Sequence, residues 1–262
     1  MPQINFQLRE YQKTIIEAAK DKNTLVVLPT GLGKTKIAIA LAIERLSKFP
    51  DSKILICSPT KPLSNQIKEE FIASTNANRV ELLTGLISPK NRESLYDKTK
   101  IIIATPQTIQ KDIENNRLKL DNFSLLVIDE AHRSRLKFSN TLVAKKYIEQ
   151  SQYPRILALT ASPGSTKEKI EEIKKNLFIE AIEIRDEDNL DVKEYIQKKD
   201  IQWVEVDLPK EFQDIHKLLT EIYKKRLTQL KNFGITKPVS VINKKDLISF
   251  QNYLFLEAKR GN

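Results

Sequence analysis

The chain has 262 residues, of which 40% are hydrophobic and 30% charged, and its formal net charge is +10. This composition excludes a disordered chain, and no apolar run approaches the roughly 20 residues that span a bilayer. Cys57 is the single cysteine, which excludes an internal disulfide and a cysteine metal cage, and the N-terminus has no basic and apolar leader. We therefore expect an intracellular protein. Its basic charge suits either a polyanionic partner or simple solubility.

The first two-thirds of the chain alternates short apolar runs with longer amphipathic segments. The apolar runs predict strands at Thr24–Leu28, Lys53–Ser58, Lys100–Ala104, Leu125–Ile128 and Ile156–Thr160. The segments between them predict helices, among them Thr35–Lys48, Pro62–Ser74 and Pro106–Asn115. Apolar strands separated by helices are typical of a parallel sheet covered on both faces. The predicted fold is therefore α/β, with ligands bound beyond the carboxyl ends of the strands.

The pattern changes after about residue 165. The predicted elements there are a helix at Thr166–Leu177, a strand at Ile201–Leu208 that contains Trp203, and helices at Lys210–Lys231 and from about Lys245 to Ala258, with Gly234 ending the first of these two. From Lys210 onward the chain has eleven basic and five acidic residues. A solvated helix face is the ordinary interpretation of such a run, and contact with nucleic acid is the other.

The segment Leu28–Thr35 joins a predicted strand to a predicted helix and contains Gly-Leu-Gly-Lys-Thr. Glycines such as Gly31 and Gly33 let main-chain N–H groups point at phosphate oxygens at the start of a helix. Lys34 would reach the β- and γ-phosphates, and the Thr35 hydroxyl would hold Mg²⁺. The strict phosphate-loop pattern has glycine where this chain has Leu28. In this setting the segment predicts a nucleoside triphosphate site.

A second motif, the acidic segment Asp129-Glu130-Ala131-His132, follows the apolar strand at 125–128. Acidic residues in this position often only cap the next helix. Beside a phosphate loop, however, Asp129 can bind Mg²⁺ and Glu130 can polarise the water that attacks the γ-phosphorus. His132 is either a coupling residue or a histidine that only satisfies local hydrogen bonds, and we favour coupling.

Together with Thr160-Ala161-Ser162, these motifs occur in the order and approximate spacing of motifs I, II and III of superfamily 2 helicases, which the chain resembles. The resemblance implies a RecA-like sheet, with ATP and Mg²⁺ as cofactors. It implies coupling by His132, Thr160 and Ser162. It also implies nucleotide contacts by Arg9 and Gln12, of which Gln12 reads the adenine, and by Thr30 in the phosphate loop.

The same resemblance places nucleic-acid contacts after further predicted strands. The residues implied are Pro59, Thr60, Lys61, Gln66, Thr84, Gly85, Thr105 and Pro106. Hydroxyls, main-chain amides and a lysine at strand ends can bind phosphates without reading a base sequence. Each short motif alone is an ordinary turn, so the prediction depends on their occurrence at successive strand ends.

The residues that make up these motifs most closely resemble those of the archaeal Hef and eukaryotic FANCM group of DEAH-box proteins. That group remodels stalled forks and branched junctions, which implies forked or branched DNA as the partner, no membrane, and a cytoplasmic or nucleoid-associated place in an archaeal cell. The implied domains are a first lobe at 1–200, a linking strand at 201–208 and an incomplete, thumb-like helical insertion at 209–262. A second lobe that supplies arginines to the ATP site is expected downstream, so this chain alone should be weakly active or inactive.

Two alternatives remain open at this point. Dicer and the innate-immune RNA sensors share much of the motif set and act on double-stranded RNA, and backbone-gripping motifs barely distinguish the two sugars. The other alternative is a non-hydrolytic nucleic-acid-binding module that uses the basic helices near the C-terminus.

Overall fold

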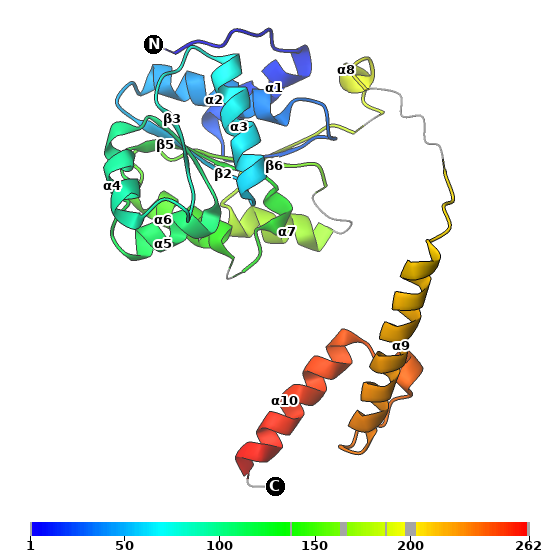
Figure 1. Cartoon of the computed structure of the whole chain (residues 1–262). Coiled ribbons are helices and arrows are strands. Elements are labelled where there is room, and N and C mark those ends of the chain that lie inside the picture. The colour runs from blue at the N-terminus through cyan, green and yellow to red at the C-terminus, as the bar shows by residue number, and fades with distance from the viewer. Residues whose placement is uncertain (1, 137, 163–166, 187, 197–202, 261–262) are drawn as a thin grey trace. The chain divides into compact units, whose positions relative to one another are not determined.

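The computed structural model describes the whole chain except residues 1, 137, 163–166, 187, 197–202 and 261–262. The chain divides into two compact units, Met1–Lys198 and Lys199–Asn262. Each unit is described by itself (Figure 1).

A parallel sheet forms the centre of the first unit. Within the described residues it has seven strands in the order β3-β4-β2-β5-β6-β1-β7, and every ladder is parallel. The strands are β1 (Thr24–Val27), β2 (Lys53–Cys57), β3 (Val80–Leu83), β4 (Ile101–Ala104), β5 (Phe123–Ile128), β6 (Ile156–Thr160) and β7 (Ala181–Ile184). Because all strands run in one direction, the segments that follow them meet at one edge of the sheet.

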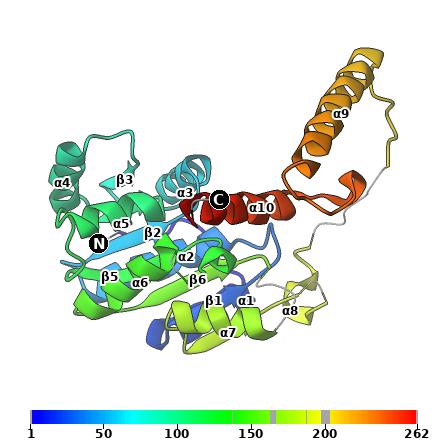
Figure 2. The same cartoon turned by 90° about the horizontal axis from the view of Figure 1, so that it is seen from below.

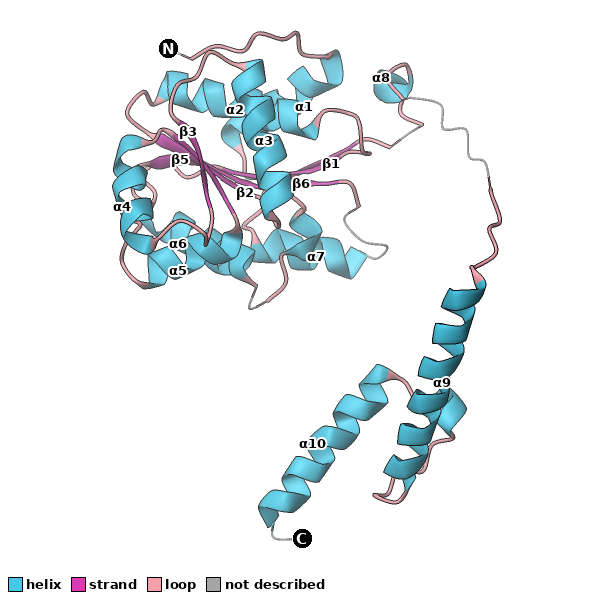
Figure 3. Cartoon of the chain, viewed as in Figure 1, coloured by secondary structure: helices cyan, strands magenta, loops and turns pink. Residues whose placement is uncertain are grey.

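Helices cover both faces of this sheet, and each face has its own apolar core (Figure 3). One core contains residues of α1 (Glu10–Asp21), α2 (Lys34–Lys48) and α3 (Lys61–Ser74). The opposite core contains residues of α4 (Pro89–Lys98), α5 (Pro106–Glu114), α6 (Ser139–Gln150) and α7 (Lys167–Asn176). A 3₁₀ turn, η1 (Ala131–Arg133), and the short α8 (Leu190–Lys193) complete the unit. The predicted α/β fold is confirmed.

The sequence predicted the five inner strands to within two residues at either end but missed β3 and β7. Both are edge strands, bonded to a single neighbour. Val80 and Leu83 at the ends of β3 are buried, but no residue of β7 is, and the two strands contain the partly buried Glu81 and Glu183, so neither reads as a continuous apolar run. A search for strands buried on both faces therefore overlooks them.

In the second unit, α9 (Lys210–Lys231) and α10 (Lys244–Arg260) confirm the two predicted helices, with η2 (Val239–Val241) between them. Gly234 has the predicted left-handed backbone, with φ of 104°, although Asn232 is the capping residue of α9. Many large apolar side chains of α9 are exposed, including Phe212 and Leu218. None of the helices in the described residues is both long and apolar enough to cross a membrane.

The predicted strand at Ile201–Leu208 is not present in its described part. Residues 201 and 202 lie outside the described residues, and Trp203–Leu208 has no strand structure. Its apolar side chains are exposed, with Trp203 at 92%. A strand exists only when a neighbouring strand completes its ladder of hydrogen bonds, and this segment has no such neighbour among the described residues.

Asn23, which precedes β1, joins three strands through its side chain and main chain. Its Oδ1 accepts a hydrogen bond from Ile156 N at 2.9 Å, and its Nδ2 donates to Phe178 O at 3.0 Å. Its main-chain oxygen accepts from Glu180 N and Ala181 N, which begin β7. Asn23 therefore aligns the amino ends of β6 and β7 with β1.

Replacing Asn23 by alanine should lower the free energy of unfolding by about 2–3 kcal/mol, because a buried N–H (Ile156) and a partly buried carbonyl (Phe178) lose their partners. Urea denaturation measures the change. Asn122→Ala is the matched control, since Asn122 makes one exposed side-chain bond, to Asp51 O, and should cost below about 1 kcal/mol. Equal losses in the two variants would contradict this role for Asn23.

Candidate functional site

The strand order separates the predicted site residues into two groups along the carboxyl edge of the sheet. β3, β4 and β2 are neighbours, and the predicted nucleic-acid contacts follow these three strands. β5, β6 and β1 are also neighbours, and the predicted ATP and coupling residues lie at or after the ends of these strands, except Arg9 and Gln12, which lie at the start of α1. Figure 2 shows the strands side by side from the face that α6 and α7 cover. Residues far apart in the sequence are thus brought into two adjoining surfaces.

The phosphate loop connects β1 to α2. Gly31 and Gly33 both have left-handed backbones, with φ of 88° and 75°, which side chains disfavour. Lys34 begins α2, and its Nζ donates to Leu28 O at 2.9 Å and Pro29 O at 3.2 Å. Burial lowers the pKa of Lys34, while Glu130 and Asp129 act in the opposite direction. The lysine is therefore held within its own loop, close to both carboxylates.

The other residues of the phosphate loop differ in exposure. Thr30 is exposed at the tip of the loop, and Thr35 is half-buried in the first turn of α2. Leu28, the departure from the strict glycine pattern, is fully buried in the apolar core. Its N–H donates to Thr160 O at 3.0 Å, and its carbonyl accepts from Lys34. The side chain at position 28 therefore packs in the core and does not occupy the loop.

The acidic pair follows β5 directly. Asp129 N donates to Cys57 O at 2.9 Å, and Asp129 Oδ2 accepts from Ser58 Oγ at 3.0 Å. Burial raises the pKa of Asp129; the Ser58 hydrogen bond opposes this, and the negative charge of Glu130 adds to it. Glu130 itself has a left-handed backbone, with φ of 53° and ψ of 50°. Such a conformation is uncommon for a residue with a side chain and is often found at functional sites.

A chain of polar contacts connects Glu130 to the end of β6. His132 Nδ1 lies 3.2 Å from Glu130 Oε2 and 3.1 Å from Thr160 Oγ1. The Thr160 hydroxyl donates to Ser162 O, and it accepts from Ser162 N, both at 3.1 Å. His132 Nδ1 thus lies within hydrogen-bonding distance of both the Glu130 carboxylate and the Thr160 hydroxyl. The three predicted coupling residues are in contact.

The predicted adenine-reading segment packs on the phosphate loop. Gln12 is 4% exposed; its Oε1 accepts from Arg9 N at 3.0 Å, and its Nε2 donates to Leu32 O at 3.3 Å. Tyr11 OH donates to the same carbonyl at 2.7 Å. A Cβ atom on Gly33 would lie 2.6 Å from Gln12 Nε2, so only glycine fits there without a shift.

Tyr195 is a neighbour of this segment that the sequence did not indicate. The guanidinium carbon of Arg9 lies 4.3 Å from the centre of the Tyr195 ring, a cation–π contact. The Tyr11 and Tyr195 rings are 5.7 Å apart. No motif surrounds Tyr195 in the sequence, so only the packing of the segment after α8 against α1 reveals it.

The predicted nucleic-acid contacts differ in exposure. Thr60, Lys61, Gln66 and Gly85 are exposed, Pro59 and Thr105 are half-buried, and Thr84 and Pro106 are buried. Thr60 Oγ1 caps α3 by accepting from Leu63 N. The exposed members can meet a phosphate directly, whereas Pro106 can only shape the start of α5.

Thr35 and Asp129 fit a magnesium site that a nucleotide completes. Among the described residues no group of three or more His, Cys, Asp or Glu side chains could hold a metal ion unaided. Mg²⁺ is usually held by one or two protein oxygens, the phosphates and water, and a hydroxyl and a carboxylate are of this kind. The arrangement therefore suits a metal that arrives with ATP.

Comparison with known proteins gives a consistent result. The pattern of the DEAD/DEAH box helicase family matches residues 9–170. A relative from Methanocaldococcus jannaschii, provisionally named an ATP-dependent RNA helicase, is 43% identical over 95% of this chain and 32% of that protein. The ATP-dependent DNA helicase fml1 of Schizosaccharomyces pombe is 36% identical over 94% of this chain and 30% of that protein.

The fold also matches a solved structure. The crystal structure of the Pyrococcus furiosus Hef helicase domain superposes with a TM-score of 0.72 and 40% sequence identity, covering 98% of this chain and 54% of that one. The chain thus spans about a third of the length of the two relatives and about half of the solved domain.

Removing the Ser58 hydroxyl should raise the pKa of Asp129 further. The ionised carboxylate then loses the hydrogen bond that stabilises it, and this bond no longer offsets the effect of burial. Below that pKa the carboxyl is protonated and cannot bind a cation, so the acid limit of magnesium binding should move to higher pH. Titration of a ¹³C-labelled Asp129 carboxyl in Ser58→Ala measures the shift.

Ser52→Ala is the matched control for this titration. Ser52 is an equally buried serine that shares a hydrogen bond with Ser124 instead of a carboxylate. An unchanged pKa of Asp129 in Ser58→Ala, or the same shift in both variants, would contradict the assignment.

Proposed function

Because this chain belongs to the DEAD/DEAH box helicase family, we propose that it is the ATP-binding first lobe of an ATP-dependent DNA helicase or translocase that acts on forked or branched DNA. The observation that supports the proposal is the sheet order: the residues proposed to bind DNA follow β3, β4 and β2, and those proposed to bind the phosphates and Mg²⁺ follow the adjoining strands β5 and β1.

In the proposed reaction each residue of the nucleotide half has a separate task. Lys34 exchanges its two carbonyl partners for the β- and γ-phosphates, which offer a stronger, charge-assisted bond. Main-chain N–H groups around Gly31 and Gly33 bind the same phosphates, and Gln12 and Arg9 hold the adenine. Thr35 and Asp129 would hold Mg²⁺, which would supply positive charge against the charge that develops during phosphoryl transfer. Glu130 orients the attacking water.

The effect of ATP hydrolysis is then transmitted through hydrogen bonds that the structure already contains without a nucleotide. A change at Glu130 reaches His132 directly, and His132 in turn contacts Thr160. Thr160 is bonded both to Ser162 and, through its carbonyl, to the phosphate loop at Leu28. Loss of the γ-phosphate would alter this chain of hydrogen bonds and so move the segment after β6.

The DNA half of the edge would bind one strand by its phosphates. The exposed Thr60, Lys61 and Gly85 offer a hydroxyl, an ammonium and an open main chain, none of which reads a base. Sequence-independent binding is what a protein that moves along DNA or remodels forks requires. Such a substrate places the protein in the cytoplasm or on the nucleoid.

We further propose that residues 1–200 form the first lobe, that 201–208 connect it to a second lobe, and that 209–262 begin a helical insertion. The share of the relatives that this chain spans supports a second lobe elsewhere in the full protein. Its arginines would complete the ATP site, and an arginine of this kind contributes roughly 10³–10⁵ in rate. The 262-residue chain alone should therefore bind ATP but hydrolyse it very slowly.

Lys34→Ala in the 262-residue chain should abolish binding of a fluorescent ATP analogue, because no other cation reaches the phosphates from the loop. Lys53→Ala is the control, since Lys53 is also partly buried but donates to main-chain oxygens at the opposite edge of the sheet. Equal affinities in the two variants would contradict the ATP site. Rapid DNA-stimulated hydrolysis that Lys34→Ala abolishes would refute the need for a second lobe.

The choice of nucleic acid can be tested by competition, since the names of the two relatives differ between DNA and RNA. A labelled forked DNA bound to the chain should be displaced by unlabelled forked DNA at a lower concentration than by duplex RNA of equal length, as measured by fluorescence anisotropy. A preference for the RNA would overturn the DNA proposal in favour of an RNA-directed helicase.

A further inference from the structure

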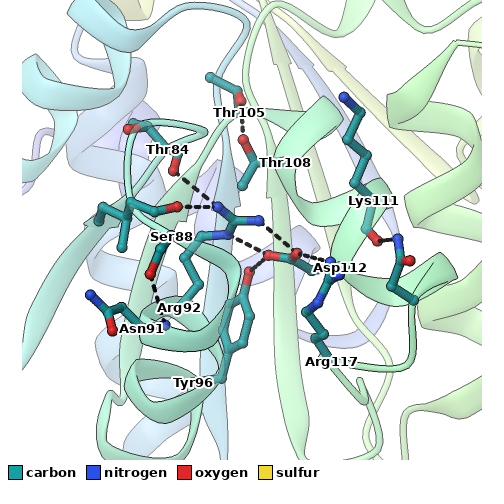
Figure 4. Close-up of polar contacts among 12 residues, drawn as sticks. Thr84, Ser88, Asn91, Arg92, Tyr96, Thr105, Thr108, Lys111, Asp112 and Arg117 are labelled. Atoms are coloured by element: carbon teal, nitrogen blue, oxygen red, sulfur yellow. Dashed lines mark hydrogen bonds and ion pairs between the residues drawn. The ribbon is translucent and has the colours of Figure 1, made fainter.

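A buried ionic cluster joins α4 and α5 beside the loop that follows β3 (Figure 4). At its centre is the fully buried carboxylate of Asp112 on α5. Arg92 of α4 donates Nε to Oδ2 at 2.6 Å and Nη2 to Oδ1 at 2.7 Å. Tyr96 OH donates to Oδ2 at 2.7 Å, and Arg117 Nη1 to Oδ1 at 3.2 Å. Each carboxylate oxygen of Asp112 therefore accepts two hydrogen bonds.

The ion pair is permanent at ordinary pH. Burial alone would raise the pKa of Asp112, but hydrogen bonds from Arg92 and Tyr96 outweigh burial and lower it. The pKa of Arg92 is raised, mainly by its hydrogen bond to Asp112. A buried charge that is fully hydrogen-bonded has one stable geometry, because any displacement leaves an unpaired charge in a medium of low dielectric constant.

Arg92 also makes two bonds that the ion pair does not require. Its Nη1 donates to Thr84 O at 3.5 Å and to Ile87 O. Both carbonyls belong to the loop that follows β3 and contains the exposed Gly85. Because β3 is a four-residue edge strand with one neighbour, this loop has little other support from the sheet.

Asp112 connects the same cluster to a second loop. It lies on α5, the helix that begins at Pro106, immediately after Thr105. The hydroxyls of Thr105 and Thr108 are hydrogen-bonded at 2.9 Å across the first turn of this helix. A single guanidinium–carboxylate pair thus joins the loop after β3 to the helix that begins after β4.

We propose that Arg92 and Asp112 are positioning residues for nucleic-acid binding, which hold the Thr84-Gly85 loop at a fixed distance from Thr105. The inference rests on the proposed function, since it assumes that these two segments bind one DNA strand. Successive phosphates of a strand have a set spacing, so two contacts bind together only when the loops that make them keep that spacing. The pair does not touch the DNA.

Arg92→Lys in the 262-residue chain tests the proposal, because lysine keeps the charge but its single nitrogen cannot take the three separate positions from which Nε, Nη1 and Nη2 reach Asp112 and the loop carbonyls. We expect the Kd for labelled forked DNA to rise about tenfold, the effect of losing one charge-assisted contact. The Kd for the ATP analogue should stay within about twofold of wild type, since the nucleotide residues lie after other strands. Hydrogen exchange of residues 84–88 should also accelerate.

Arg45→Lys is the matched control for a loss of stability. Arg45 is as buried as Arg92 and also donates to main-chain oxygens, to Ser124 O and Tyr153 O, at the opposite edge of the sheet. It should lower the melting temperature to a similar degree and leave the Kd for DNA unchanged. If both variants weaken DNA binding equally, Arg92 has a general structural role and the proposal is overturned.

A double-mutant cycle identifies the route of the effect. The double variant of Thr84→Ala and Arg92→Lys should weaken DNA binding by less than the sum of the two single effects, because both substitutions act on one loop. The effects of Lys61→Ala and Arg92→Lys on the binding free energy should instead be additive. Full additivity of the first pair would overturn the proposal. If Arg92→Lys does not fold, Tyr96→Phe removes one bond to Asp112, and we expect a rise of about two- to threefold in Kd. No rise would count against the proposal.

Different results would contradict the proposed function and the positioning role of Arg92 and Asp112. If wild-type chain binds no nucleic acid, or Lys61→Ala has no effect on binding, the proposed function fails and this inference falls with it. If Lys61→Ala weakens binding while Arg92→Lys binds DNA as wild type does, only the positioning role is overturned.

Discussion

The common direction of the strands is the constraint on which the rest of this structure depends. In a parallel sheet every connection returns to the starting edge, so the residues after each strand gather at the opposite one. Neighbours are then set by strand order and not by chain order. This is how Leu28 comes to donate to Thr160 O, and Asp129 to Cys57 O. These main-chain bonds extend the ladders one residue beyond the strands, into the site itself.

Much of this arrangement was predictable because it depends on local patterns. Strands buried on both faces must be apolar, so their positions followed from the sequence. The residues after them are polar because they meet ligands or solvent. The edge strands β3 and β7 lacked this signal, since Glu81 and Glu183 face partly into solvent. The stretch at Trp203–Leu208 carried the apolar signal but has no neighbouring strand among the described residues.

Contacts across long sequence separations were not predictable from these patterns. Tyr195 meets Arg9, and Arg92 meets Thr84 and Asp112, only because helices pack in a particular way on the sheet. In the sequence each of these residues resembles an ordinary surface residue of an amphipathic helix or loop. Single-residue chemistry could identify Lys34 and Asp129, whose motifs are local. It could not identify the residues that hold the motifs in place.

The left-handed backbone at Glu130 has a consequence for stability. A conformation of this kind costs about 1–3 kcal/mol for a residue with a side chain, and asparagine or glycine would bear it more easily. Glutamate at this position therefore makes the folded state less stable than it could be. In this conformation Glu130 Oε2 lies 3.2 Å from His132 Nδ1. The folded chain thus retains a small, local backbone strain at the residue that is proposed to orient the attacking water.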